Sequence, residues 1–67
     1  MSAEAYHVVS NPEGGWNVIK GGSKRATKRF DTKDQAVSWG LLVSKREGSE
    51  FVIHKKDGTI ERKDSHV

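Results

Sequence analysis

The absence of cysteine is the strongest constraint on how this 67-residue chain can fold. A chain of about 60 residues buries only about 60% of the surface that it exposes when unfolded, so its stability is marginal. Domains of this size are commonly reinforced by disulfides, by a structural metal or by a partner chain. The lack of cysteine excludes disulfides, thiolate zinc sites and cysteine nucleophiles. The composition remains compatible with reinforcement by a partner chain, so we regard oligomerisation as the main remaining possibility.

A chain of this length forms one domain, which we place over residues 1–67 with frayed ends at residues 1–4 and 65–67. Its two tryptophans, two phenylalanines and one tyrosine provide apolar surface to bury, which argues against disorder. No apolar run approaches the roughly 20 residues that span a bilayer, and the first residues lack the basic and apolar regions of a secretion signal. We therefore expect a cytoplasmic protein that is not associated with a membrane.

Turn-forming residues divide the first half of the chain into three strands. Residues 5–10, AYHVVS, have the β-branched content of a strand, and residues 15–20, GWNVIK, follow the same pattern. The NPEGG stretch between them combines a proline, which fixes φ, with glycines, which adopt positive φ at little cost. The sequence predicts a hairpin here, with Trp16 directed into the core, and a third strand over residues 26–30.

The second half of the chain begins with helical spacing. Thr32 and Gln35 match the S/T-x-x-E/Q capping box, and small or apolar residues then recur every three or four positions. Lysine and arginine occupy the last turn of this pattern, and Gly48 supplies a stop. These signals predict a helix over residues 33–47.

Two further strands are predicted after the helix. Residues 49–56, SEFVIHKK, form the first of them, and the Asp57-Gly58 pair is a strong hairpin signal that returns the chain as a short strand over residues 59–63. The resulting order, βββ-α-ββ, predicts an α+β fold in which an antiparallel-rich sheet of four to five strands packs on one helix.

Alternation along each strand separates a face under the helix from a solvent-exposed face. The face under the helix is expected to carry Tyr6, Val8, Trp16, Val18, Ala26, Phe30, Phe51, Ile53 and Ile60. The opposite face is expected to carry His7, Val9, Asn17, Ile19, Thr27, Arg29, Val52 and His54. The same alternation assigns Lys28 to the face under the helix. We expect it to lie at the sheet edge with its amine reaching solvent.

Several linked motifs resemble a known family. YHVV, NPEGGWNV, FDTK followed by an alanine, and VIHKKDGTI together are similar to a family of small bacterial and phage-associated domains of unknown function, number 2188. The resemblance extends from Tyr6 to about Asp64 and implies a compact α+β domain, but it supplies no activity. This chain departs from the family pattern at Leu41, Leu42 and Ile19, where the resemblance implies charged residues.

No catalytic or metal-binding motif stands out in the sequence. It contains no nucleophile elbow, phosphate loop or HExxH motif, and a fold of this size has little room for a deep pocket. We therefore expect no enzyme, no small-molecule substrate and no cofactor. His7 and His54 share a predicted face, but two histidines are fewer than the ligands of a usual metal site, so we interpret them as solvent-facing.

The distribution of charge gives a first functional hypothesis, a non-catalytic nucleic-acid-binding accessory domain. The net charge is +3, and residues 16–30 hold five cations and no acid. Clustered cations neutralise phosphates and release counterions, and exposed strands can enter a major groove. The expected contacts with duplex DNA come from Lys20, Lys24, Arg25, Lys28, Arg29 and Lys55. The alternative is a solvated basic edge that prevents pairing between strands of different molecules.

The helix surface gives a second hypothesis, a protein-interaction module or a homodimer. At 100° per residue the core stripe centres near Gly40, so that Leu42 projects outside it. Trp39, Leu41, Leu42 and Arg46 then have the composition of a partner-binding patch. The alternative is that Trp39 covers the sheet edge and that Leu42 is an isolated apolar residue on the surface.

Overall fold

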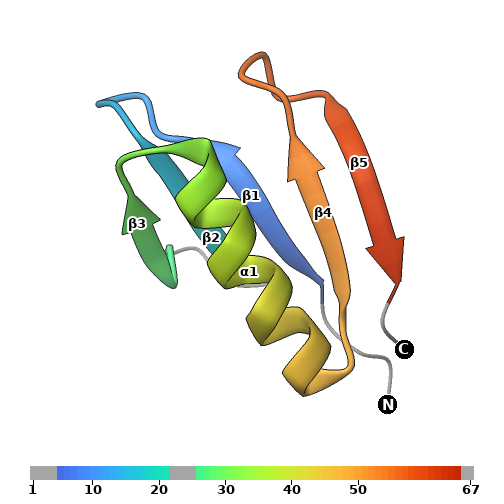
Figure 1. Cartoon of the computed structure of the whole chain (residues 1–67). Helices are drawn as coiled ribbons and strands as arrows, with labels where there is room; N and C mark the ends of the chain where they lie inside the picture. The colour runs from blue at the N-terminus through green and yellow to red at the C-terminus, as the bar shows by residue number, and fades with distance from the viewer. Residues whose placement is uncertain (1–4, 22–25, 66–67) are drawn as a thin grey trace.

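One helix packs on one face of a five-stranded sheet in the computed structural model, which describes residues 5–21 and 26–65 (Figure 1). The elements are β1 (Tyr6–Ser10), β2 (Trp16–Lys20), β3 (Lys28–Phe30), α1 (Lys33–Glu47), β4 (Glu50–His54) and β5 (Ile60–Ser65). This order confirms the predicted α+β fold class and the predicted helix. Ser65 ends β5 and pairs with Glu50, and the other residues that we expect to fray, 1–4 and 66–67, lie outside the described residues.

The sheet is mixed, with strand order β3-β2-β1-β4-β5. Neighbouring strands are antiparallel except for the central pair, in which β1 and β4 are parallel. Parallel neighbours require a long crossover connection, which is provided here by the segment that contains β2, β3 and α1. The central pair therefore joins the first strand of the chain to its C-terminal hairpin.

The NPEGG stretch forms the predicted turn between β1 and β2. The Asn11 amide donates to the Gly15 carbonyl at 2.9 Å, and the Gly14 amide donates to the Asn11 carbonyl at 2.9 Å. Gly14 and Gly15 have φ angles of 108° and 82°, which favour glycine. The backbone of the turn that leads into Trp16 thus requires glycine at both positions. The Trp16 ring is partly buried against the core beneath Lys33 of α1, whose Nζ lies 5.2 Å from the ring centroid.

The predicted caps define both ends of α1. The Thr32 hydroxyl accepts a hydrogen bond from the Gln35 amide at 3.2 Å. At the other end Gly48 adopts φ 64°, and its amide donates to the Lys45 carbonyl at 3.3 Å. The Asp34 carboxylate in the first turn and the cations in the last turn also suit the helix dipole.

The core lies between α1 and the central strands. Its buried apolar residues are Tyr6, Val8, Val18, Ala36, Phe51 and Ile53. The buried stripe of α1 consists of the small residues Ala36, Gly40 and Ser44, as the predicted stripe centred near Gly40 requires. A Cβ atom at Gly40 would lie 2.6 Å from Cε1 of the buried Phe51 ring. The helix backbone therefore rests directly on an aromatic ring.

Three residues differ in burial from what strand alternation predicts. Ala26 is exposed because β3 begins only at Lys28. Ile60 is also exposed, at 59%, because the register shifts between Ile53 and His54. Ile53 pairs with Arg62 and His54 with Ile60, so the irregularity turns Ile60 to the face opposite the helix.

Val52 is the third exception, since it is only 3% exposed on the face opposite α1. In the sheet register it lies between His7 of β1 and Lys63 of β5, and side chains on both neighbouring strands shield it. Lys28 lies at the sheet edge as expected, with its Nζ 5.4 Å from the Phe30 ring centroid.

The contact between Gly40 and Phe51 predicts that Gly40→Ala lowers the free energy of unfolding. Replacing a helical glycine gains about 1 kcal/mol in propensity, whereas overpacking a filled core costs about 1–3 kcal/mol. We expect the packing cost to dominate because the Phe51 ring is itself buried in the core. Urea denaturation measures the difference, with Ser38→Ala on the exposed side of α1 as the control. A Gly40→Ala variant as stable as wild type would contradict this packing.

Candidate functional site

The six cations of the proposed nucleic-acid interface are divided by the fold. Lys28 and Arg29 are neighbours on β3, and their side chains therefore lie on opposite faces of the sheet. Lys55 follows β4 in the turn to β5, at the opposite end of the sheet from Lys20, which ends β2. Lys24 and Arg25 lie outside the described residues. The cluster in the sequence is thus not a single cluster in space.

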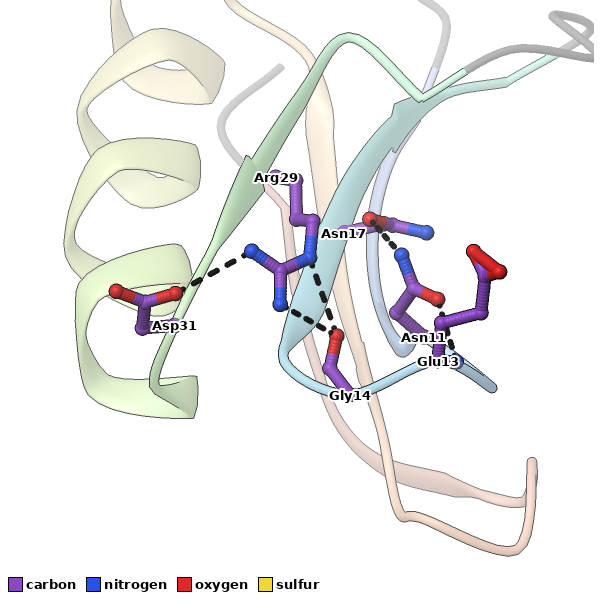
Figure 2. Close-up of polar contacts among 6 residues, drawn as sticks. All are labelled: Asn11, Glu13, Gly14, Asn17, Arg29 and Asp31. Atoms are coloured by element: carbon purple, nitrogen blue, oxygen red, sulfur yellow. Dashed lines mark hydrogen bonds and ion pairs between the residues drawn. The ribbon is translucent and has the colours of Figure 1, made fainter.

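Arg29 connects two loops of the protein itself (Figure 2). Its Nε and Nη2 atoms donate to the Gly14 carbonyl at 3.1 Å and 2.8 Å. Its Nη1 atom lies 3.2 Å from the Asp31 carboxylate, just before α1. The guanidinium therefore fixes the β1–β2 loop to the connection that leads into the helix, and Asp31 offsets part of its charge.

Side-chain amides complete this network around the β1–β2 loop. The Asn11 carboxamide donates to Asn17 Oδ1 at 3.2 Å, and its own Oδ1 accepts from the Glu13 amide at 2.8 Å (Figure 2). An asparagine at the start of a turn commonly bonds to the backbone two residues later, so the sequence carried a signal for this contact. The sequence contains no comparable signal for the hydrogen bonds from Arg29 to Gly14, because these bonds form only when β2 pairs with β3.

We predict that Arg29→Ala loosens the β1–β2 loop. Loss of the guanidinium leaves the Gly14 carbonyl without two charged hydrogen-bond donors. Hydrogen bonds to charged groups contribute about 1.5–3 kcal/mol, and we expect less than this here because Arg29 is exposed. The measurement is amide hydrogen exchange at Asn11 and Gly14, which should accelerate.

Arg62→Ala is the matched control for this substitution. Arg62 also forms an exposed ion pair, with Asp64 at 3.1 Å, but it lies on β5 away from the loop. If both variants accelerate exchange at Asn11 and Gly14 equally, the guanidinium of Arg29 does not hold the loop.

A different set of cations lies on two elements that meet at one end of the sheet, β2 and the last turn of α1. Lys20 Nζ lies 3.7 Å from Glu47 Oε1, and the Tyr6 hydroxyl donates to Glu47 Oε2 at 2.7 Å. These contacts hold the last turn of α1, which carries Lys45 and Arg46, beside the end of β2. We call the end of β2 together with the last turn of α1 the basic end, and define it by the described cations Lys20, Lys45 and Arg46.

Lys55 is separated from the basic end. The Ser10 hydroxyl donates to the Lys56 carbonyl at 3.3 Å, which places the β4–β5 turn beside the end of β1. The chain reverses direction between β1 and β2, so this turn and the end of β2 lie at opposite ends of the sheet (Figure 1). Lys55 and Lys56 are exposed there beside Asp57.

The proposed partner-binding patch on α1 is only partly exposed. Trp39 packs against the core, with its ring centroid 5.7 Å from that of Phe30, and Leu41 also packs there. Leu42 is 57% exposed, and Arg46, one turn further along the same helix face, is exposed as well. Trp39 thus covers the sheet edge, and the surface that remains is formed by Leu42 and Arg46.

The face opposite α1 brings His7 and His54 into contact. Their Nδ1 and Nε2 atoms are 2.9 Å apart, and His54 Nδ1 lies 3.0 Å from the Gly58 carbonyl. A carbonyl only accepts, so His54 carries its proton on Nδ1 and accepts at Nε2 from His7 Nδ1–H. Burial and, second, the neighbouring His54 hold the pKa of His7 below its ordinary value of 6.5. The sequence placed both rings on one face but could not predict this contact.

No cluster of three or more histidine, aspartate or glutamate side chains has an arrangement suited to a metal ion within residues 5–21 and 26–65. Over the same ranges, no helix has both the length and the apolar character needed to cross a membrane.

Comparison with known proteins places this fold in a family. Residues 6–66 match DUF2188, which is described as an uncharacterized protein conserved in bacteria. The chain belongs to the DUF2188 family. The DUF2188 domain is similar to YdaT of Bacillus subtilis strain 168, described as an uncharacterized protein, with 33% identity over 60 residues. The match covers 90% of this chain but 39% of the relative, so the chain spans about two fifths of that protein.

No solved structure gives a significant match to this chain. The resemblance predicted from the YHVV, NPEGGWNV and VIHKKDGTI motifs is confirmed by the family match, which extends from Tyr6 to His66.

Proposed function

We propose that this DUF2188 domain is a non-catalytic module that binds the phosphate backbone of duplex DNA through its basic end. The observation that carries the proposal is the contact of Lys20 with Glu47, because it brings the last turn of α1 to the end of β2. Two cation-rich segments that are distant in the sequence then contribute to one surface. A cytoplasmic location belongs to the same proposal.

The charge balance at the basic end supports an anionic partner. Glu47 is engaged by Lys20 and by the Tyr6 hydroxyl. Among the described residues, Lys45 and Arg46 form no ion pair. In the sequence, Lys24 and Arg25 follow Lys20 closely and add further positive charge. Positive charge from the last turn of α1 therefore adds to that of the segment that begins at the end of β2.

The positions of the aromatic rings favour a duplex over a single strand. Proteins that bind single strands stack bases on exposed aromatic side chains. Here Tyr6 and Phe51 are buried, and Trp16, Phe30 and Trp39 pack against the core. Contacts from lysine and arginine to phosphates need no stacking surface, so a sequence-independent duplex contact fits this arrangement best.

We predict that Lys45→Ala/Arg46→Ala weakens binding of a fluorescent DNA duplex, measured by anisotropy at several salt concentrations. Each phosphate contact contributes about 0.9 to the slope of log affinity against log salt, so loss of two contacts lowers the slope by about 1.8. Lys55→Ala/Lys56→Ala removes the same charge at the opposite end of the sheet and should leave the slope unchanged.

Two results would count against the basic end as the binding surface. The first is no anisotropy change at low salt with about 100 µM protein, the weak limit of non-specific binding. The second is an equal effect of the two double variants, since binding would then follow total charge alone.

The exposed Leu42 favours a second candidate function, self-association through the Leu42–Arg46 surface. We predict that the mass of the wild-type chain in sedimentation equilibrium rises with concentration and that Leu42→Glu abolishes the rise. Ile60→Glu is the matched control, because Ile60 is equally exposed on the opposite face, at 59% against 57% for Leu42. A wild-type chain that stays monomeric at the highest concentration, or an Ile60→Glu variant that alone dissociates, would exclude this dimer.

A further inference from the structure

The contact between His7 and His54 crosses the central pair of strands on the sheet face that α1 leaves open. His7 lies on β1 and His54 ends β4, and these two parallel neighbours join the first strand to the C-terminal hairpin. The ring centroids are 5.2 Å apart with the planes tilted by 32°, whereas His7 Nδ1 and His54 Nε2 are 2.9 Å apart. The two rings therefore meet through these nitrogens, in a single hydrogen bond.

The hydrogen bonds of the pair leave a place for one additional proton. His54 donates its Nδ1–H to the Gly58 carbonyl at 3.0 Å, and His7 donates its Nδ1–H to His54 Nε2. In the neutral pair, the lone pair of His7 Nε2 is the remaining site for a proton. A proton added there turns His7 into an imidazolium, whose hydrogen bond to His54 is charge-assisted and therefore stronger. The contact is thus kept while the pair carries one positive charge.

A second additional proton is incompatible with this contact. It would have to enter at His54 Nε2, so that two N–H groups would point at each other across 2.9 Å. The two rings would then also be cations that repel each other in a half-buried position. Burial and, second, the neighbouring His54 hold the pKa of His7 below its ordinary value of 6.5, in agreement with the exclusion of the second proton.

The neighbouring strands place no carboxylate against either ring. Ile19 of β2 pairs with His7, and Ile60 of β5 pairs with His54, so both cross-strand neighbours are uncharged. Within residues 5–21 and 26–65, no ion pair involves a histidine. The charged side chains of the strands on this face are Arg29, which pairs with Asp31, and Lys63 and Glu50, which pair with each other. A second positive charge on the histidines is therefore left without a compensating carboxylate.

The β4–β5 turn beside His54 contributes Lys55, Lys56 and Asp57, all of them exposed. Hydrogen bonds from Thr59, first from its hydroxyl and then from its amide, hold the pKa of Asp57 below its ordinary value of 3.8. Asp57 is thus already ionised throughout the range in which histidines titrate. Its charge is constant there, and a change of the contact in that range comes from the histidines.

We propose that the His7–His54 contact is a pH-sensitive link between β1 and the C-terminal hairpin, which holds while the pair carries at most one positive charge and breaks when both rings are protonated. In the unfolded chain both rings take up a proton as the pH falls below about 6.5, whereas the folded pair takes up only one. The unfolded chain then binds more protons, so stability is lost as the pH falls below 6.5. The loss ends once the folded pair also accepts its second proton. The link lies on the face opposite α1 and does not depend on the DNA contact proposed above.

The first test compares the pH dependence of urea unfolding in wild type, His7→Asn and His54→Gln, from neutral pH to about pH 5. Each replacement offers an amide near the position of the ring nitrogen that it removes and leaves one titrating ring in the contact. A difference of one bound proton changes the unfolding equilibrium constant about tenfold per pH unit. Below pH 6.5 the wild-type constant should therefore rise by up to about tenfold per unit more than that of either variant.

His66→Gln is the matched control, because it removes the third histidine of the chain and leaves the pair intact. It should keep the pH dependence of wild type. If wild type, His7→Asn and His54→Gln all have the same pH dependence, the proposal is overturned.

Magnetic resonance of the wild-type chain with isotopically labelled histidine rings makes a second test that is independent of the folding of any variant. At neutral pH we expect a scalar coupling between His7 Nδ1 and His54 Nε2, which an N–H···N hydrogen bond transmits. On acidification the pair should titrate in two separate steps, and the coupling should disappear in the second. Absence of the coupling at neutral pH, or titration of both rings in one step as independent residues, would exclude the link.

Discussion

The contact of the α1 backbone with the Phe51 ring determines how the rest of the domain is arranged. A Cβ atom at Gly40 would come within 2.6 Å of that ring, so glycine is what allows the helix to lie so close to the sheet. The short distance in turn lets Ala36 and Ser44 complete a buried stripe of small residues. With the helix held in this position, its last turn meets the end of β2, where Glu47 reaches Lys20. The composition of the basic end is therefore a consequence of core packing.

Local signals were sufficient to predict the elements of the fold but not their pairing. The capping residue Thr32, the stop at Gly48 and the Asp57-Gly58 turn act within a few residues, and the structure confirms each of them. The parallel pairing of β1 with β4 depends on contacts across the whole crossover, for which the sequence carries no local signal. The register shift that exposes Ile60 has the same origin, since it concerns the pairing of β4 with β5 and not the residues of β5 alone.

The candidate site was less predictable than the fold, because side chains that are adjacent in a strand point to opposite faces of the sheet and carry their charges with them. A run of cations in a strand is divided between two faces, so Lys28 and Arg29 cannot act on the same surface. Arg29 is further engaged by Gly14 and Asp31, which a count of charges along the chain does not reveal. The helix has the opposite effect, because the contact of Glu47 with Lys20 holds the turn that carries Lys45 and Arg46 beside the end of β2.

The central strand pair is also the place where the chain has most to gain from a link. A chain without cysteine has no disulfide to hold these strands together. On the face under α1, the register pairs Tyr6 with Phe51 and Val8 with Ile53, and all four side chains are buried in the core. On the open face, His7 and His54 stand 47 positions apart in the sequence, and their Nδ1 and Nε2 atoms are 2.9 Å apart in the fold. A hydrogen bond contributes a net of about 0.5–1.5 kcal/mol, which is a substantial part of a total stability of about 5–15 kcal/mol. The histidine contact therefore supports, on the open face, the same joining of β1 to the C-terminal hairpin that the core supports on the other.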